Sequence, residues 1–360
     1  MKTLFRVLFL PLALTILFTQ CEKEPNPNNP IDISDQAFLN ALIEEGVDTD
    51  GDGSISFLEA ETVDSLKVGF FDIKDLSGIE SFINLRLLIC WGNQLKNIDI
   101  SKNSLLEQLY CDANQIISLD ISQNTALQVL SCGINQIEYL DISQNPLLWG
   151  LTCFENQLSN LDVSKNPELV GLHCWQNQIT TLNLSSLEKL EGLGCDNNQI
   201  STLDVSNNQM LRLLECRGNY LTEIDISQNT KLEYLKCGNN SIGSLDVSNN
   251  KDLILLDCNE SQLTDLDISL NTKLEDVYCA YNQLHSIDLS ENTALRAIFL
   301  NGNELNQLDL STNTSLEHIG ISLMSDLSEV CVWIIPFPPP EVYVDTTGSP
   351  NVYFTTECNK

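Results

Sequence analysis

Ten cysteines recur along this chain, one at every twenty-first position, without interruption. Two further steps of the same length reach Leu300 and Ile321, which occupy the same place in the repeat. The ten are Cys90, Cys111, Cys132, Cys153, Cys174, Cys195, Cys216, Cys237, Cys258 and Cys279. A fixed period of this length is typical of a solenoid, in which each repeat forms one coil that contacts only its neighbours. The 360 residues are therefore expected to form one elongated domain and not several compact ones.

The repeat reads L-x-x-L-x-C-x-x-N-Q-[LI]-x-x-L-D-[IV]-S-x-N-[TP]-x. Leu130 and Cys132 alternate with Val129 and Ser131, which predicts a strand with the cysteine on its inner side. The asparagine at the third position after each cysteine is expected to bond main-chain groups at a turn, and only Ser261 interrupts that column. The second half of the unit predicts a second extended segment, because so short a repeat leaves little room for a helix.

This unit resembles the bacterial leucine-rich repeats with cysteine at one leucine position, and its ladder resembles that of the cysteine-ladder internalins. The resemblance implies a mostly β solenoid over residues 67–321, with parallel strands stacked along a curved rod and little helix within the repeats. We expect the ladder to be reduced and buried, as a column of small apolar side chains. Disulfides or a metal site are the alternatives. Equivalent side chains of parallel strands point the same way, which is poor disulfide geometry, and no Cys-x-x-Cys spacing occurs.

The first residues have the pattern of an export signal. Residues 1–20 contain Lys2, Arg6 and an apolar run that has the length of a signal-peptide core and is too short to span a membrane as a helix. Cys21 and the acidic residues after it resemble the lipid-acceptor end of a bacterial lipoprotein signal, and residues 21–32 are predicted to form a tether. The resemblance implies an exported lipoprotein of the outer membrane or cell surface of a Gram-negative bacterium. An ordinary signal peptide cut nearby is the alternative, and so is display toward the periplasm.

Residues 33–66 contain the most specific local motif and are expected to form a helical cap over the first end of the solenoid. The segment from Asp48 to Glu59 has carboxylates at its first, third, fifth and twelfth positions and a glycine at its sixth, so it resembles an EF-hand loop. The resemblance implies one Ca²⁺ held by Asp48, Asp50, Asp52, Ser54, Ser56 and Glu59. We expect Ser34 or Asp35 to cap the preceding helix, and an exit helix over residues 57–66. The alternative is a degenerate loop that serves only as a cap.

A formal charge of −32 and a pI of about 4.1 argue against nucleic acid and anionic membrane surfaces as partners, because both would be repelled. Contact with a membrane is then expected through the lipid alone, and the chain is expected to be a monomer. One aspartate per repeat forms a column from Asp99 to Asp309, interrupted by Asn183. Neighbouring carboxylates would lie about 4.8 Å apart in stacked coils. Two interpretations remain open: a stripe that binds cations, and hydrogen bonding to turn amides and serines of adjacent coils.

The strand face is the expected recognition surface, because leucine-rich repeats use this concave side. The residues at the third position before each cysteine, directly before it and directly after it project from this face. In the first half of the solenoid the face carries Trp91, Tyr110, Phe154, His173 and Trp175, with Trp149 close by. Exposed aromatic side chains of this kind mark binding sites for proteins or sugar rings. The alternative is that they pack on one another as a surface without a partner.

Residues 322–360 depart from the repeat and are predicted to form a β cap, in which Cys331 and Cys358 pair as a disulfide. The favoured function is a non-enzymatic surface protein that recognises a protein or glycan. A passive rod braced by calcium is the alternative. A hydrolase is a remote alternative, since the chain has no H-E-x-x-H, G-x-S-x-G or phosphate-loop motif and only three histidines.

Overall fold

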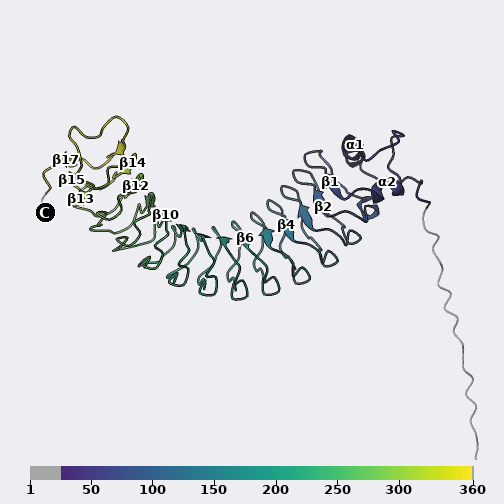
Figure 1. Cartoon of the computed structure of the whole chain (residues 1–360), viewed down its shortest axis with the longest axis horizontal. Helices are drawn as coiled ribbons and strands as arrows, with labels where there is room; N and C mark the ends of the chain where they lie inside the picture. Colours follow the sequence, from purple (N-terminus) through teal and green to yellow (C-terminus); the bar gives the residue numbers. More distant parts are fainter. Residues whose placement is uncertain (1–25, 359–360) are drawn as a thin grey trace, which may run out of the picture.

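The computed structural model describes residues 26–358, which form one curved rod (Figure 1). The expected signal peptide and Cys21 lie outside these residues. A parallel sheet of 14 strands, one from each coil, lines the concave side of the rod (Figure 1). In spatial order its strands are β1 (Ser65–Lys67), β2 (Leu87–Ile89), β3 (Gln108–Tyr110), β4 (Val129–Ser131), β5 (Gly150–Thr152), β6 (Gly171–His173), β7 (Gly192–Gly194), β8 (Leu213–Glu215), β9 (Tyr234–Lys236), β10 (Leu255–Asp257), β11 (Asp276–Tyr278), β12 (Ala297–Phe299), β14 (His318–Gly320) and β16 (Tyr343–Asp345). The predicted solenoid is confirmed.

Each strand has three residues, and its middle residue faces the interior in most coils. Leu130 of β4 pairs with Leu109 and Leu151 on the neighbouring strands, and all three are buried. The cysteine directly after each of the ten strands β2 to β11 is also fully buried, and all ten are free thiols. Burial raises the pKa of the Cys174 thiol to about 12, so this thiol remains protonated and packs as an apolar group. The cysteine ladder is therefore a structural column of the core.

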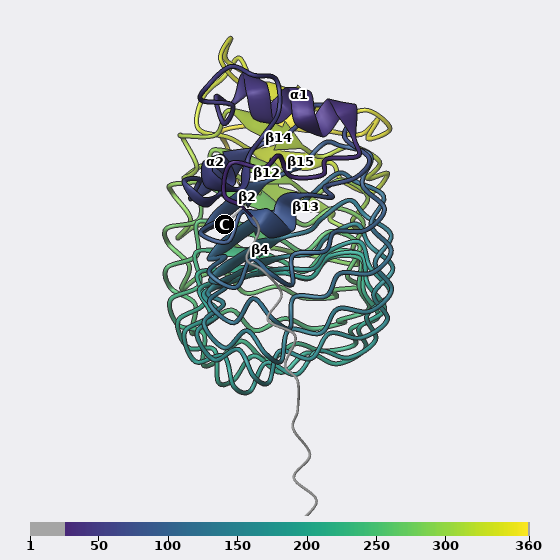
Figure 2. The ribbon, with the colours of Figure 1, turned by 90° about the vertical axis from the view of Figure 1, so that its right-hand side faces the viewer.

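Two columns of asparagine join each coil to the one before it. In the first, the Asn135 amide donates to the carbonyls of Cys111 and Cys132, both at 3.1 Å, while its Oδ1 accepts from the Ile116 N–H at 2.9 Å. In the second column, which is buried, the Asn124 amide donates to the carbonyls of Ile100 at 3.0 Å and Asn103 at 2.9 Å. These bonds satisfy main-chain carbonyls that no strand pairs. Viewed along the rod, the coils lie nearly one behind another (Figure 2).

The predicted second extended segment forms strands only near the C-terminal end. There β13 (Gln307–Asp309), β15 (Glu329–Cys331) and β17 (Tyr353–Thr355) make a separate parallel sheet of three strands. In the earlier described coils the same segment is irregular, because its main chain reaches the neighbouring coil mainly through turn bonds such as Gln136 N–H to the Ile116 carbonyl. The structure joins Cys331 to Cys358 in this region, with their Cα atoms 5.6 Å apart.

Two helices cap the N-terminal end, α1 (Gln36–Glu44) and α2 (Phe57–Glu61), and a 3₁₀ turn, η1 (Ile79–Ser81), follows β1. Asp35 caps α1 by accepting the N–H groups of Ala37 and Phe38. The exit helix predicted over residues 57–66 is wrong in its length. It ends at Glu61, because Leu66 belongs to β1 and pairs with Leu88 of β2, the next strand of the sheet.

The segment before α1 is docked on the acidic loop. Ile31 N–H donates to the Ile55 carbonyl at 2.8 Å, and Leu58 N–H donates to the Pro27 carbonyl at 2.8 Å. Ile31 is buried, although it falls within the predicted tether of residues 21–32. None of the helices formed by residues 26–358 is long and apolar enough to cross a membrane.

Candidate binding face

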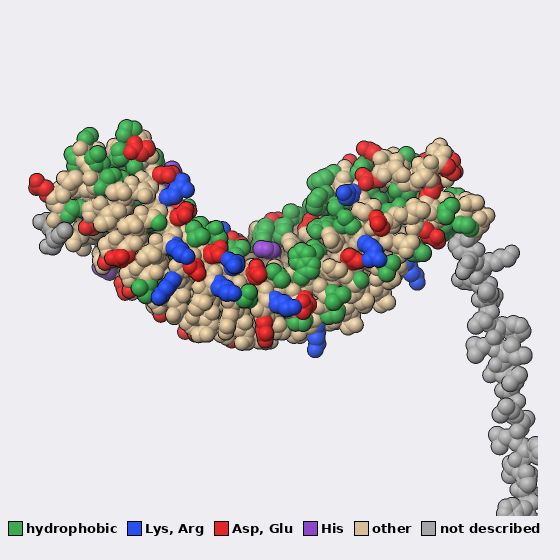
Figure 3. All heavy atoms as spheres, in the orientation of Figure 1, with side chains coloured by type: hydrophobic (Ala, Val, Ile, Leu, Met, Phe, Trp, Pro, Cys, Tyr) green, Lys and Arg blue, Asp and Glu red, His purple; other side chains and the backbone are tan. Residues whose placement is uncertain are grey.

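The aromatic residues predicted for the concave face form two clusters. Trp91 is the second residue after β2 and meets Tyr110 of β3 edge to face, with ring centroids 6.2 Å apart. Phe154 and Trp175 are the second residues after β5 and β6, and their rings stack with centroids 4.2 Å apart and planes within 4°. Because the coils are in register, a spacing of one repeat along the chain becomes a ring contact between neighbours. Hydrophobic side chains gather along the N-terminal half of the inner face, and charged ones along the C-terminal half (Figure 3).

Polar residues separate the two clusters. The Asp112 carboxylate accepts from the Ser131 hydroxyl at 2.7 Å and from the Gly133 N–H at 2.8 Å. Trp149 precedes β5 and is 49 % exposed, while His173 ends β6 beside the stacked pair. The six predicted residues thus lie on or beside one face, but as two patches and not as a continuous stripe.

A charged network continues the face toward the C-terminal half. Lys236 Nζ lies 2.7 Å from the Glu215 carboxylate, and the Arg217 guanidinium lies 3.3 Å from Asp257. Asp196 accepts the Arg217 main-chain N–H at 2.6 Å. Burial raises the pKa of the Asp196 carboxyl to about 6, and this bond only partly offsets the effect. The sequence places these residues on the face, but their pairing depends on side-chain directions that the spacing does not specify.

Phe70 is a functional candidate that the sequence reasoning missed. It is 77 % exposed and lies beside Trp91 at the N-terminal end of the face, with its ring over Gly92. Trp91 in turn covers Gly69, where an added Cβ would come within 2.4 Å of the indole. The sequence did contain one indication of this contact: Gly92 in the neighbouring coil has no side chain, so the Phe70 ring can lie across it.

The EF-hand-like loop brings three of its carboxylates together. Oxygens of Asp48, Asp50 and Glu59 lie within 4.8 Å of one another. The Asp52 carboxylate instead accepts from the Ser54 N–H at 2.8 Å and from its hydroxyl at 2.7 Å. Ser54 and Ser56 follow in the same loop, and Ser56 is the N-cap of α2. Oxygen donors of this kind suit a hard cation such as calcium.

Glu59 is fixed by four hydrogen bonds. One carboxylate oxygen accepts from the N–H and hydroxyl of Thr49 at 2.7 and 2.8 Å, and the other accepts from the N–H and hydroxyl of Ser56, both at 2.9 Å. The Ser56 N–H has the largest effect, and together these donors lower the pKa of Glu59 to about 2. The carboxylate is therefore ionised over the whole physiological range and already positioned at the last place of the loop.

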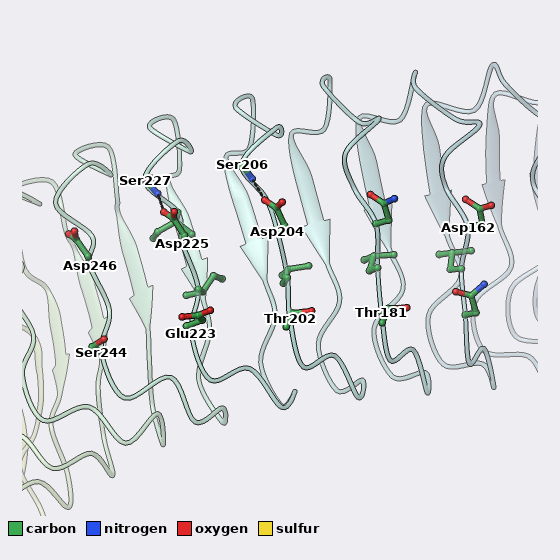
Figure 4. A pocket seen from close by; sticks show the side chains of 17 residues that line it. Asp162, Thr181, Thr202, Asp204, Ser206, Glu223, Asp225, Ser227, Ser244 and Asp246 are labelled. Atoms are coloured by element: carbon green, nitrogen blue, oxygen red, sulfur yellow. Dashed lines mark hydrogen bonds between the residues drawn. The ribbon is translucent and has the colours of Figure 1, made fainter.

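The aspartate column lies across each coil from the strands, and its middle part, from Asp162 to Asp246, lines a hollow of about 1040 Å³ (Figure 4). Each aspartate accepts the N–H of the next serine along the chain, as Asp204 does from Ser206 and Asp225 does from Ser227, both at 2.9 Å. These serines belong to the same coil, so the prediction of bonds to adjacent coils is wrong. Asn183 makes the equivalent bond to Ser185 at 3.1 Å. The column is a set of local turn bonds that an amide also provides.

Several solved structures have a fold similar to that of this chain. The chain is similar to the functional domain of InlJ from Listeria monocytogenes, which includes a cysteine ladder: identity is 30 %, the TM-score is 0.74, and the match covers 84 % of this chain and 76 % of that one. The internalin InlF from Listeria monocytogenes matches with 22 % identity and a TM-score of 0.73, over 92 % of this chain and 99 % of that one. A leucine-rich repeat protein of Leptospira interrogans matches with 19 % identity and a TM-score of 0.63, over 80 % and 97 % of the two chains.

No protein-family model and no curated protein matches the chain. The two weaker structural matches show the fold alone. The match to InlJ goes further, because its identity extends over most of both chains and because the ladder itself is shared. This chain belongs to the internalin-type leucine-rich repeat proteins with a cysteine ladder.

Proposed function

We propose that this chain is a non-enzymatic recognition protein that binds its partner through the concave strand face. The observation that carries the proposal is the concentration of large, partly exposed aromatic side chains there, at positions where stacking of the coils does not require them. Rigid aromatic side chains contribute much contact area at low entropic cost and are enriched in binding hot spots. The family also favours a binding scaffold, since the structural neighbours are leucine-rich repeat proteins.

Truncation of the aromatic clusters tests this function. The probes are a glycan array and an array of purified cell-surface protein ectodomains, both incubated with the full chain. Trp175→Ala should weaken a positive signal by roughly 30-fold, the loss expected of a hot-spot residue worth about 2 kcal/mol. Tyr139→Ala is the matched control, because Tyr139 is 69 % exposed but lies outside the strand face. A signal that survives truncation of Trp91, Phe154 and Trp175 would contradict the proposal.

We also propose that the N-terminal loop binds one calcium ion as a structural brace. The convergence of Asp48, Asp50 and Glu59 supports this site, with Asp52, Ser54 and Ser56 as the remaining donors of the motif. The ion would neutralise carboxylates that otherwise repel one another. The same loop receives the segment around Ile31, so the ion would also hold the start of the chain against the cap.

Thermal melting with and without a chelator tests the calcium site. Binding to the folded state alone adds about 1.4 kcal/mol when calcium exceeds its dissociation constant tenfold. Glu59→Gln keeps the size of the side chain and its role in the helix cap, so it should remove the response to calcium without unfolding α2. Asp64→Asn, an exposed carboxylate outside the loop, is the control. An identical melting curve with and without calcium would rule out a bound ion.

A lipid on Cys21 is proposed as the means of membrane attachment. The residue lies outside the described part of the chain, and the proposal depends on the resemblance of its sequence surroundings to a lipoprotein signal. Cys21→Ser should release the protein from the membrane fraction, because a chain with a charge of −32 is repelled by anionic lipid. A variant that still pellets with membranes would show that another anchor exists.

A further inference from the structure

One coil in the C-terminal half departs from the regular path of the chain. Ser261 occupies the place that asparagine holds in the neighbouring coils, and its side chain is too short to bridge two coils. Asn240, one coil earlier, donates to the carbonyls of Cys216 and Cys237 at 3.0 and 2.9 Å. Within residues 26–358, the buried Ser261 hydroxyl donates to the Asn259 carbonyl of its own coil alone, at 3.3 Å. The serine therefore lacks the side-chain bond that joins other turns to the preceding coil.

The main chain after Ser261 turns over as a result. In regular coils the residue after the asparagine donates its N–H to a carbonyl of the preceding coil, as Gln283 does at 2.8 Å. At Ser261 the direction is reversed, because the Gly243 N–H of the preceding coil donates to the Ser261 carbonyl at 3.0 Å. Gln262 accordingly has a φ of +60°, the one positive value at this repeat position within residues 94–304. Such a φ is unfavourable for a residue with a side chain, so this turn is strained.

A hollow of about 400 Å³ opens beside the altered turn, and Glu260, Gln262 and Tyr281 line it. All three residues are exposed, and Tyr281 is so by 53 %. Glu260 and Gln262 flank Ser261 in the sequence, while Tyr281 belongs to the next coil. The hollow thus coincides with the one interruption of the asparagine column. A place where a structure departs from its own local rule is where a functional site is expected.

The side chains that line the hollow present mainly hydrogen-bond acceptors. The Glu260 carboxylate makes no hydrogen bond and no ion pair with any residue of 26–358. Gln262 donates its Nε2 to the Ser241 hydroxyl oxygen at 3.0 Å, so its Oε1 is the end of the amide that can accept from a ligand. Of the three side chains, only Tyr281 has a further donor, its hydroxyl. A fitting ligand is therefore rich in donors, and the carboxylate favours one with a positive charge.

The Tyr281 ring adds an aromatic surface to these acceptors. It lies against Gly302 of the next coil, where an added Cβ would come within 2.7 Å of the ring. No aromatic side chain of residues 26–358 stacks on Tyr281, in contrast to Tyr278, whose ring stacks on Phe299 with centroids 5.2 Å apart. The side of the ring toward the hollow is therefore open. An aromatic face attracts a cation that lies over it within about 6 Å of the ring centre.

We propose that this hollow, which we call the Tyr281 hollow, binds the guanidinium group of an arginine carried by a protein partner. The planar group would lie flat on the Tyr281 ring, while N–H groups at its edge donate to the Glu260 carboxylate and to Gln262 Oε1. The ammonium group of lysine is a compact point charge and has no flat face to stack. A sugar would need more donors than these three side chains supply.

Charge favours an arginine within a polypeptide over the free amino acid. No lysine, arginine or histidine lines the Tyr281 hollow, so the described chain offers no cation there for the α-carboxylate of free arginine. Glu260 and the chain's charge of −32 would repel that carboxylate, whereas they attract a cationic surface on a protein. The site lies in a different part of the rod from the two aromatic clusters, so it goes beyond the recognition function proposed for them.

An NMR titration of the full chain, labelled with ¹³C on its tyrosine rings, tests the proposal. The probes are N-acetyl-arginine methylamide, its lysine counterpart and its citrulline counterpart, which has the shape of arginine without the charge. The Tyr281 signals, assigned with Tyr281→Phe, should shift and saturate with the arginine probe in the millimolar range expected of one side chain. The lysine probe should bind about threefold more weakly and the citrulline probe at least about tenfold more weakly. Free L-arginine should also bind more weakly than the arginine probe.

Two substitutions test the site itself. Glu260→Gln should weaken binding of the arginine probe by about tenfold, because it removes the charge from the hollow. Ser261→Asn alters none of the three lining side chains but restores the asparagine of the repeat. It should return Gln262 to the regular turn, raise the melting temperature and weaken the arginine probe by about tenfold or more. Glu155→Gln is the matched control, because it removes the same charge at the same repeat position of a coil that keeps its asparagine, Asn156, and should leave binding unchanged.

Several results would overturn the proposal. They are equal binding of the arginine and citrulline probes, equal losses in Glu260→Gln and Glu155→Gln, and no shift of the Tyr281 signals with any probe. Full binding in a Ser261→Asn variant with a raised melting temperature would show that the altered turn does not create the site. Saturation by an oligosaccharide, or by free L-arginine at lower concentration than the arginine probe, would assign the hollow to a different ligand. None of these results bears on the aromatic clusters, which Trp175→Ala tests separately.

Discussion

The two faces of each coil follow opposite rules. Across the coil from the strands, five successive repeats place Asp162, Asn183, Asp204, Asp225 and Asp246 at one position, and every one accepts the N–H of the next serine along the chain. On the strand face, the same five repeats place Thr152, His173, Gly194, Glu215 and Lys236 at one position. Residues that repeat are those that a turn or a stack requires. Residues that vary are free to specify a ligand.

The buried asparagine column is a repeated feature of the interior. Its amide groups satisfy two carbonyls in each coil, yet the Oδ1 atoms of ten of these asparagines have no hydrogen-bond partner. A buried acceptor without a partner costs free energy, so the column is kept for what its Nδ2 groups donate. Leu187 breaks the column once, and there the Ser186 hydroxyl donates to the Val163 carbonyl at 3.4 Å.

The largest effect is expected from this interior column. Asn229→Ala removes the bonds to the Val205 carbonyl at 3.0 Å and the Asn208 carbonyl at 2.9 Å, and leaves each carbonyl with only its main-chain turn bond, from the Asn208 N–H and the Leu211 N–H. The loss of two buried hydrogen bonds should lower the free energy of unfolding by about 1 to 3 kcal/mol. Chemical denaturation measures it.

The neighbouring Gln228 is exposed, so Gln228→Ala should change the unfolding free energy by less than about 0.5 kcal/mol. Leu187→Asn is the converse substitution, because it places an asparagine at the one position where the column is interrupted. If Asn229→Ala and Gln228→Ala lower the free energy of unfolding equally, the repeated interior positions are no more important for stability than the exposed ones.

A smaller effect is expected on the varied face, at Asp196. Burial raises the pKa of this carboxyl from its ordinary 3.8 to about 6, so between these values the folded chain binds a proton more readily than the unfolded chain. Stability is therefore lost as the pH rises through this window, and above it the ionised carboxylate is a net cost. Asp196→Asn should raise the unfolding free energy at about pH 8 by about 1 kcal/mol, after allowance for solvent screening.

The gain should shrink at about pH 4, where the wild-type carboxyl is protonated in the folded state and about half protonated in the unfolded state. The amide oxygen of the variant can still accept the Arg217 N–H. Melting curves at the two pH values measure the difference, and the same gain at both would show that the carboxyl does not titrate above its ordinary range. Such a residue, held at a stability cost on the ligand face, fits a role in binding and not in folding.

The periodic part of the fold was predictable because one rule applies to every coil. The alternation around Leu130 and the spacing of Cys132 determine the strand, its register and the buried ladder. Where the period ends, sequence reasoning was less accurate. The helix predicted to reach Leu66 stops at Glu61, because competition with sheet pairing is not visible in local helix signals.

The candidate site was predictable in position but not in detail. The spacing of Phe154 and Trp175 already implied a contact, whereas the salt bridge of Arg217 with Asp257 skips one coil and depends on rotamers.

The smallest effect is expected from the aspartate column, where one substitution also tests whether the repeated face binds cations. Asp225→Asn keeps an oxygen that can accept the Ser227 N–H, as Asn183 does for Ser185, so the melting temperature at neutral pH should not change. The Ser227 N–H lowers the pKa of Asp225, so the wild-type stabilisation is present above its ordinary pKa of 3.8 and lost as the pH falls through the lower folded value. Only in strong acid should the variant be the more stable chain. A calcium-dependent rise in melting temperature that persists in Glu59→Gln but disappears when Asp225→Asn is added would show instead that the column binds calcium, and the two faces would then both be functional.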